Sequence, residues 1–212
     1  KEAYVPDFDG VHGQAVVAAP TILSFHAEIT GKASHAGFAP EQGVSAISAA
    51  ARAIDSLRLG RITDDLTRNI GKIHGGLLTN IVPEACAVEG EIRASVHAEA
   101  LDCLEETKQA FEKTCDAFGA VLNFTSKCLV TAYHTPEDAP VVQRYFRACE
   151  KFGLKTEAVR TFGGSDNNIL ALRGISGIVI PSAMHACHSS AEYTIVEELV
   201  LLAELLTELL CL

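Results

Sequence analysis

The sequence contains no tryptophan, only one methionine and no cluster of basic residues. Its 17 lysines and arginines stand against 27 aspartates and glutamates, so the formal net charge is −10. A surface that binds nucleic acid needs clustered positive charge, and the composition therefore argues against a nucleic-acid partner. The seven cysteines form an odd set without a Cys-x-x-Cys pair, which is typical of reduced thiols in a cytoplasmic protein.

Long uncharged apolar runs are also missing. The most apolar stretch, Ile195 to Leu212, carries four glutamates, so it predicts a terminal core helix and no membrane partner. No positively charged leader followed by an apolar core opens the chain. The sequence starts at Lys1 without an initiator methionine and runs straight into a strand-like pattern. We therefore expect it to enter a longer domain part-way.

The segment from Thr21 to Thr131 shows the order strand, helix, strand, strand, helix, strand. In its first strand Leu23, Phe25, Ala27 and Ile29 alternate with polar residues, as in a strand with one buried face. The order predicts a ferredoxin-like βαββαβ domain, with an antiparallel sheet and helices on one of its faces. An exposed edge strand would let this domain pair with a second copy, so we predict a homodimer.

Beyond Pro136 helices alternate with strands, which is typical of an α/β layer. The last helix is expected to begin at Thr194, because Glu197 follows at the spacing of a capping box. This layer has too few strands to close a core. We therefore expect residues 1–20, which resemble a hairpin, and residues 132–212 to form one domain, with 21–131 inserted in it.

Several loops carry polar residues suited to chemistry, and each has an ordinary structural explanation when taken alone. The run from Gly163 to Asn168 has the composition of a capped turn before a helix. His185, Cys187 and His188 follow a buried strand, but a structural zinc site built around that thiol needs three more ligands than this loop offers. The other candidates are a turn acid, a loop histidine, a turn asparagine and a strand arginine: Asp7, His35, Asn80 and Arg93.

Taken together and in order, these segments resemble the metallopeptidase family that includes peptidase T, carboxypeptidase G, aminoacylase and succinyl-diaminopimelate desuccinylase. The similarity is greatest to peptidase T-like members and spans nearly the whole chain. The segments that carry it are Tyr4 to Gly10, Gly31 to Pro40, Thr79 to Pro83, Gly163 to Asn168 and His188 to Tyr193. The resemblance implies a zinc exopeptidase whose catalytic domain is interrupted by a lid that also forms the dimer.

The resemblance also implies roles for single residues at the metal. Asp7 matches the carboxylate ligand of one zinc ion, and His188 matches the late histidine ligand of the other. The family's early His-x-Asp pair and adjacent Glu-Glu, which complete the two-zinc site, have no counterpart here. Since a catalytic zinc generally uses three protein ligands, we expect the chain to be inactive alone.

The remaining implied roles concern a small peptide substrate. His35 matches a lid histidine that stabilises the carbonyl oxygen in the partner subunit's active site. Asn80 and Arg93 match lid residues that hold the substrate's carboxylate. The residues that match the lining of the substrate pocket are Gly164, Ser165 and Asp166.

Two alternative functions stay open at this point. A ferredoxin-like domain can serve as a non-catalytic dimerisation or small-molecule-binding module. An amidohydrolase acting on N-acyl amino acids is a second possibility within the same family. The resemblance assigns no role to His185 or Cys187.

Overall fold

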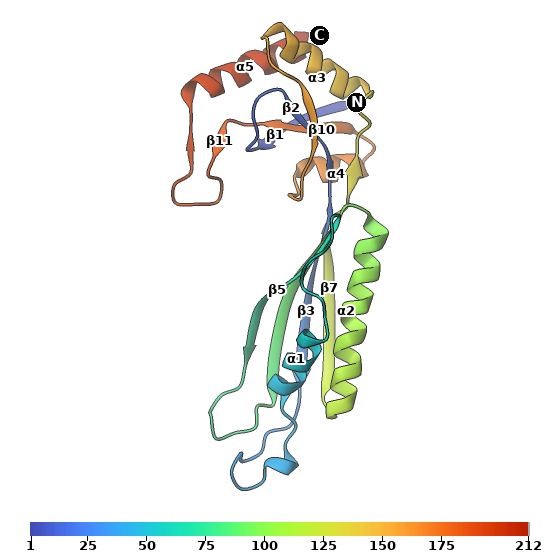
Figure 1. Cartoon of the computed structure of the whole chain (residues 1–212), viewed down its shortest axis with the longest axis vertical. Coiled ribbons are helices and arrows are strands. Elements are labelled where there is room, and N and C mark those ends of the chain that lie inside the picture. Colours follow the sequence, from blue (N-terminus) through green and yellow to red (C-terminus); the bar gives the residue numbers. More distant parts are fainter. Residues whose placement is uncertain (212) are drawn as a thin grey trace. The chain divides into compact units, whose positions relative to one another are not determined.

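The computed structural model describes residues 1–211, which divide into two compact units. Thr21–Leu129 form one of them, which we call the inserted unit. Lys1–Pro20 and the chain from Val130 onward form the other, which we call the split unit. Figure 1 shows the elements of each unit.

The split unit is built on a five-stranded sheet with the order β1-β10-β2-β8, and β9 also pairs with β2. Its helices are α3, α4 and α5. The sheet strands are β1 (Glu2–Phe8), β2 (Gln14–Ala19), β8 (Tyr133–His134), β9 (Glu157–Arg160) and β10 (Ser176–Pro181). A separate hairpin pairs β11 (Met184–His185) with β12 (Tyr193–Thr194), and the helices are α3 (Pro140–Lys151), α4 (Asp166–Leu172) and α5 (Val196–Cys211).

The expected hairpin at the start of the chain is wrong. β1 and β2 follow each other in sequence, yet β10 lies between them, parallel to β1 and antiparallel to β2. Both early strands are thus held by a strand from the far end of the sequence. Their pairing depends on a distant segment, which a local alternation of residues does not encode.

Helices cover both faces of this sheet. Ile178 and Ile180 on β10 are fully buried in a core that includes Tyr145 of α3 and Leu205 of α5. Neighbouring residues of a strand point to opposite faces, and Gly177 accordingly faces α4, where Asn167 lies against it. The β10 residues thus separate two helical layers, in agreement with the predicted α/β class.

The inserted unit has a sheet with the order β4-β5-β6-β3-β7 and two helices. The strands are β3 (Thr21–Thr30), β4 (Gly60–Thr63), β5 (Leu66–Gly75), β6 (Ala85–Ala94) and β7 (Val121–Val130), and the helices are α1 (Ala46–Asp55) and α2 (His97–Phe118). Without the short β4, the strand order β5-β6-β3-β7 and the sequence βαββαβ match the predicted ferredoxin-like arrangement. The prediction missed β4, which forms a hairpin with β5.

Both helices of the inserted unit pack on one face of its sheet (Figure 1). Alternate β3 residues such as Ala27 and Ile29 are buried with Phe111 and Cys115 of α2. Helix α2 ends at Gly119, whose φ of 70° is left-handed, the conformation expected of glycine after a helix. The polar residues that alternate with them along β3 lie on the opposite face of the sheet. Neither helix of this unit packs on that face.

Among the described residues, no helix combines the length and apolar character needed to cross a membrane. Helix α5 begins at Val196, so the expected cap at Thr194 is wrong. Thr194 belongs to β12, and its hydroxyl donates instead to the carbonyl of Ala183, at 2.7 Å. All seven cysteines are free thiols, and four of them are buried.

Candidate functional site

Asp7 lies near the carboxyl end of β1 in the split unit's sheet. Pro6 pairs with Ile180 and Phe8 with Pro181, so Asp7 is an extra residue that bulges out of the ladder. A bulge of this kind redirects a side chain and is common beside active sites. Ser182 also bonds the carbonyl of Phe8, which ties the chain after β10 to the same edge.

His188 lies in the loop of the β11–β12 hairpin, and this loop is strained. Ala183, Ala186 and His188 have φ angles of 59°, 53° and 63°, a left-handed conformation that residues with a side chain rarely adopt. Local bonds hold it, because the His188 N–H donates to Glu192 at 2.9 Å and the Ser189 hydroxyl donates to the Ala186 carbonyl at 2.7 Å. Such strain persists only where the surroundings fix it, and it is concentrated at functional sites.

The base of the same hairpin is fastened to helix α5. His185 Nε2 lies 2.7 Å from a carboxylate oxygen of Glu198, and the His185 ring stacks on Tyr193 with centroids 4.9 Å apart. His12 Nε2 reaches the backbone carbonyl of Glu198 at 3.1 Å. His185 therefore positions the loop that carries His188, a role that sequence reasoning missed.

His188 acts electrostatically on the Asp7 carboxyl although the two residues come from opposite ends of the chain. Partial burial and the negative charge of Asp166 raise the pKa of the Asp7 carboxyl, while His188 acts in the opposite direction. Partial desolvation and the carboxylates of Asp9 and Glu192 raise the pKa of the nearby Cys187 thiol. Asp166 and His188 are thus the charged residues that act in opposite directions on the pKa of the Asp7 carboxyl.

The glycine loop, residues 163–168, leads into α4. Ser165 caps this helix, because its hydroxyl accepts the Asn167 N–H at 3.3 Å and its own N–H donates to Asn168 at 3.0 Å. Gly164 and Asp166 are exposed, whereas both asparagines are fully buried. The loop is therefore a capped turn that leaves Gly164 and Asp166 exposed.

In the inserted unit, the structure brings His35 and Asn80 together. The Ala36 N–H donates to the Asn80 carbonyl at 3.0 Å, and His35 forms a bridge with Ile81. Nδ1 of His35 accepts the backbone N–H groups of Gly37 and Phe38. Because Nδ1 is an acceptor, the ring proton of the neutral imidazole is assigned to Nε2, on an exposed side chain.

Arg93 lies at the other end of β6 from this loop. It pairs with Ile22, near the start of β3, whereas Asn80 precedes the opposite end of β6 at Ala85. Its guanidinium binds both carboxylate oxygens of Glu91, at 2.6 and 3.2 Å. Within one copy of the chain, Arg93 is therefore not brought to His35 and Asn80.

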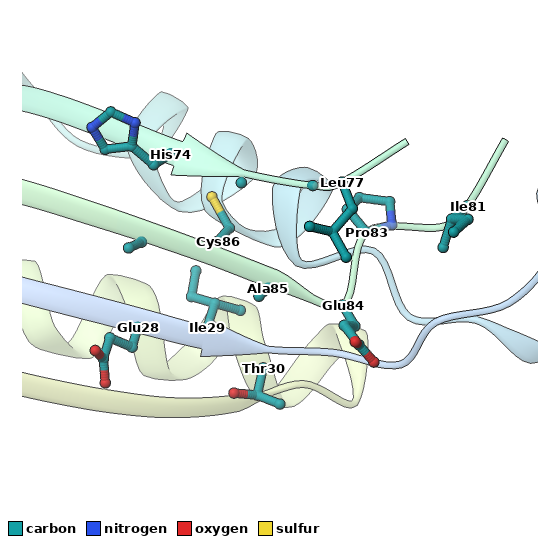
Figure 2. A pocket seen from close by; sticks show the side chains of 13 residues that line it. Glu28, Ile29, Thr30, His74, Leu77, Ile81, Pro83, Glu84, Ala85 and Cys86 are labelled. Atoms are coloured by element: carbon teal, nitrogen blue, oxygen red, sulfur yellow. The ribbon is translucent and has the colours of Figure 1, made fainter. Parts of the chain in front are cut away.

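A cavity of about 470 Å³ lies at the end of the inserted sheet where β3 ends and β6 begins. Figure 2 shows its lining, which mixes apolar side chains such as Leu77 and Pro83 with the ionisable Glu84 and His74. None of the predicted site residues lines it. Ile81 and Pro83 do line it, so the cavity adjoins the loop that carries Asn80.

The predicted ligands Asp7 and His188 do not amount to a complete metal site. In residues 1–211 no group of three or more histidine, cysteine, aspartate or glutamate side chains is arranged to hold a metal ion. A catalytic zinc generally takes three protein ligands and keeps one position open. The assignment of Asp7 and His188 as metal ligands therefore stays a prediction.

Comparison with known proteins places this arrangement in a family. Residues 17–118 match the family described as "Peptidase dimerisation domain". Residues 17–118 therefore belong to this family of peptidase dimerisation domains. An aminopeptidase PepT from Bacillus cereus is 37% identical and superimposes over 97% of this chain and 55% of its own, with a TM-score of 0.90. A tripeptidase from Staphylococcus aureus is 31% identical over the same shares, with a TM-score of 0.93.

Curated relatives of this family member show the same partial coverage. "Uncharacterized protein YqjE" of Bacillus subtilis is 34% identical over 98% of this chain and 56% of its own length. An acetylornithine deacetylase from Myxococcus xanthus is 29% identical over 82% of this chain and 48% of its own. The chain spans about half the length of the curated relatives it matches.

Proposed function

We propose that this chain is the part of a zinc-dependent exopeptidase that supplies the lid, residues 21–131, and the later part of the catalytic domain, residues 132–212, with residues 1–20 ending the first part. The substrate is a small peptide and the reaction is hydrolysis of its peptide bond. The observation that carries the proposal is the similarity of nearly the whole chain to a PepT aminopeptidase and a tripeptidase, together with the bulge that carries Asp7 at the end of β1. A strained, hydrogen-bonded loop around His188 supports it.

In this proposal Asp7 and His188 are metal ligands, one for each of two zinc ions. Two ligands fall short of the set that a catalytic zinc uses, so the remaining ligands have to come from a polypeptide outside residues 1–211. We therefore expect the isolated chain to bind zinc weakly and to hydrolyse no peptide. Gly164, Ser165 and Asp166 line the substrate pocket in this assignment.

The inserted unit contributes groups to two different sites. His35 donates its Nε2–H to the substrate's carbonyl oxygen as negative charge develops there, which a preorganised donor stabilises. Asn80 lies beside it and acts at the same site. Arg93, at the other end of the sheet, holds a substrate carboxylate with its planar guanidinium. This separation supports an arrangement in which the partner subunit receives His35 and Asn80.

The proposed homodimer forms through β7, an edge strand of the inserted sheet. Val121 and Leu129 on this strand are 69% and 44% exposed. An exposed edge strand presents unpaired backbone groups that a second copy can pair with. The free cysteines support a reducing, cytoplasmic location for this assembly.

Hydrolysis of a tripeptide with zinc present tests the proposal. The chain is assayed alone and after mixing with the segment of the Bacillus cereus aminopeptidase that precedes the matched region. We expect hydrolysis in the mixture only, and its loss in Asp7→Asn and His188→Ala variants. Appreciable hydrolysis by the chain alone would overturn the proposal.

A second candidate substrate class is an N-acyl amino acid, which the similarity to an acetylornithine deacetylase favours. The same mixture is offered N-acetyl amino acids and tripeptides in parallel. Faster cleavage of the N-acetyl compounds would make the chain part of an amidohydrolase. No cleavage of either class by a correctly folded, zinc-loaded mixture would favour a non-catalytic module.

A further inference from the structure

Asn168 makes three side-chain hydrogen bonds to three different segments of the chain. Its Nδ2 donates to the carbonyl of Pro20 at 3.2 Å and to the carbonyl of Thr131 at 2.8 Å. Its Oδ1 accepts the backbone N–H of Ser165 at 3.0 Å. The residue has 0% exposure, and both amide N–H donors are used.

The two carbonyls that it binds lie at the two places where the chain passes between the units. Pro20 is the last residue before the inserted unit, and the chain returns to the split unit at Val130. Only Pro20 separates β2 from β3, and only two residues separate β7 from β8. One buried amide thus holds both crossovers, residues 20 and 131, and the two cannot shift independently while it is in place.

The third bond joins these crossovers to the glycine loop. Ser165 begins the capped turn, and exposed Asp166 follows it. A change in chain direction at residue 20 or 131 therefore pulls on the group that fixes Ser165. The Asn168 side chain therefore connects both crossovers directly to the glycine loop.

Capping alone does not require an asparagine at this position. A capping box commonly uses glutamate or glutamine, whose side-chain oxygen accepts the same backbone N–H. A carboxylate here would leave two buried carbonyls without donors and would add a buried charge, which costs more than the cap contributes. The amide nitrogen of Asn168 is thus explained by the crossovers and not by the helix.

We propose that Asn168 is a positioning residue that couples the two crossovers to the glycine loop, so that displacement of either one is transmitted to Ser165 and Asp166. The coupling stands on the three hydrogen bonds and does not depend on the peptidase assignment. Only its consequence, that movement of the inserted unit adjusts the lining of the substrate pocket, rests on the proposed function.

Amide hydrogen exchange of the Asn168→Asp variant tests the coupling. This change keeps an oxygen for the Ser165 N–H but removes both donors to the crossovers. We expect exchange to become about tenfold faster or more in peptides 18–22, 129–134 and 163–168 together, the size expected for losing buried hydrogen bonds. Asn123→Asp, an exposed site on β7, is the matched control and should leave all three unchanged. If the three peptides exchange as in the unmodified chain, the residue is only a helix cap and the proposal is overturned.

A reciprocal variant tests the same link from its other end and serves if Asn168→Asp does not fold. Pro20→Ala frees the first crossover without changing any residue of the loop, and we expect faster exchange in 163–168. Pro140→Ala, at the start of α3, is its control. Unchanged exchange in 163–168 of the folded Pro20→Ala variant would contradict the coupling. Neither measurement involves peptide hydrolysis. A negative peptidase assay would therefore not change the conclusion about Asn168.

Discussion

His185 Nε2 lies 2.7 Å from Glu198 Oε2, and this contact fastens the hairpin of β11 and β12 to the first turn of α5. Glu198→Ala should therefore release the hairpin. We expect a loss of about 0.5–1.5 kcal/mol of local stability, the usual worth of one hydrogen bond. The measurement is hydrogen exchange in residues 184–194. Glu197→Ala, at the exposed neighbouring position, is the control, and equal effects of the two substitutions would refute the role of His185.

Cys149 predicts how stability depends on alkaline pH. Burial raises the pKa of its thiol from 9.0 to about 11. The unfolded chain therefore releases this proton first, and native stability falls as the pH rises from about 9 through 11. Cys149→Ala should remove roughly 2–3 kcal/mol of that pH-dependent loss, as measured by urea unfolding at pH 8 and pH 11.

A control for this effect comes from the same helix. Val142→Ala also truncates the buried face of α3 but removes no titratable group. It should lower stability equally at both pH values. If the two variants show the same pH dependence, ionisation of the Cys149 thiol is not the cause. Other buried thiols and tyrosines, whose pKa values are also raised, will keep part of the alkaline loss in both variants.

Gly90 on β6 should not tolerate a methyl group. A Cβ there would lie 2.2 Å from the ring of Phe25 and 2.5 Å from the carbonyl oxygen of Asn69. Gly90→Ala should destabilise the inserted unit by about 1–3 kcal/mol through overpacking. Gly71→Ala on β5 is the matched control, because its Cβ would meet nothing closer than 3.8 Å. Similar midpoints for both variants in urea would contradict this account.

The proposed dimer makes a prediction about the edge strand β7. Introducing lysine at both Val121 and Leu129 places positive charges on the strand of each copy, and charged edges resist pairing. We expect the dissociation constant to rise about tenfold or more in sedimentation equilibrium. Leu210→Lys, on exposed α5, should leave it unchanged. A dimer that is indifferent to the double substitution would use another surface.

Local patterns in the sequence predicted the elements of the inserted unit well, because its long strands and helices each show a clear period-two or helical pattern of their own. The alternation from Leu23 to Ile29 and the glycine at 119 correspond directly to β3 and the end of α2. The short β4 was missed, since four residues carry too little periodicity to identify a strand.

The split unit was predicted less completely, because its contacts join distant segments. Nothing in residues 4–18 indicates that β10 will separate β1 from β2. The hydrogen bonds of the Asn168 side chain could likewise not be predicted from local patterns, because their acceptors are backbone carbonyls far away in sequence. One usable signal was present, namely a pair of consecutive asparagines in a short helix that turned out to be fully buried.

The position of β10 between β1 and β2 also has a consequence for biosynthesis. During translation the residues of the inserted unit leave the ribosome as one uninterrupted stretch and can acquire their structure early. The first two strands, by contrast, must wait until Ser176–Pro181 has been made before their central neighbour exists. The apolar residues of β1 and β2 therefore lack this neighbour during that interval.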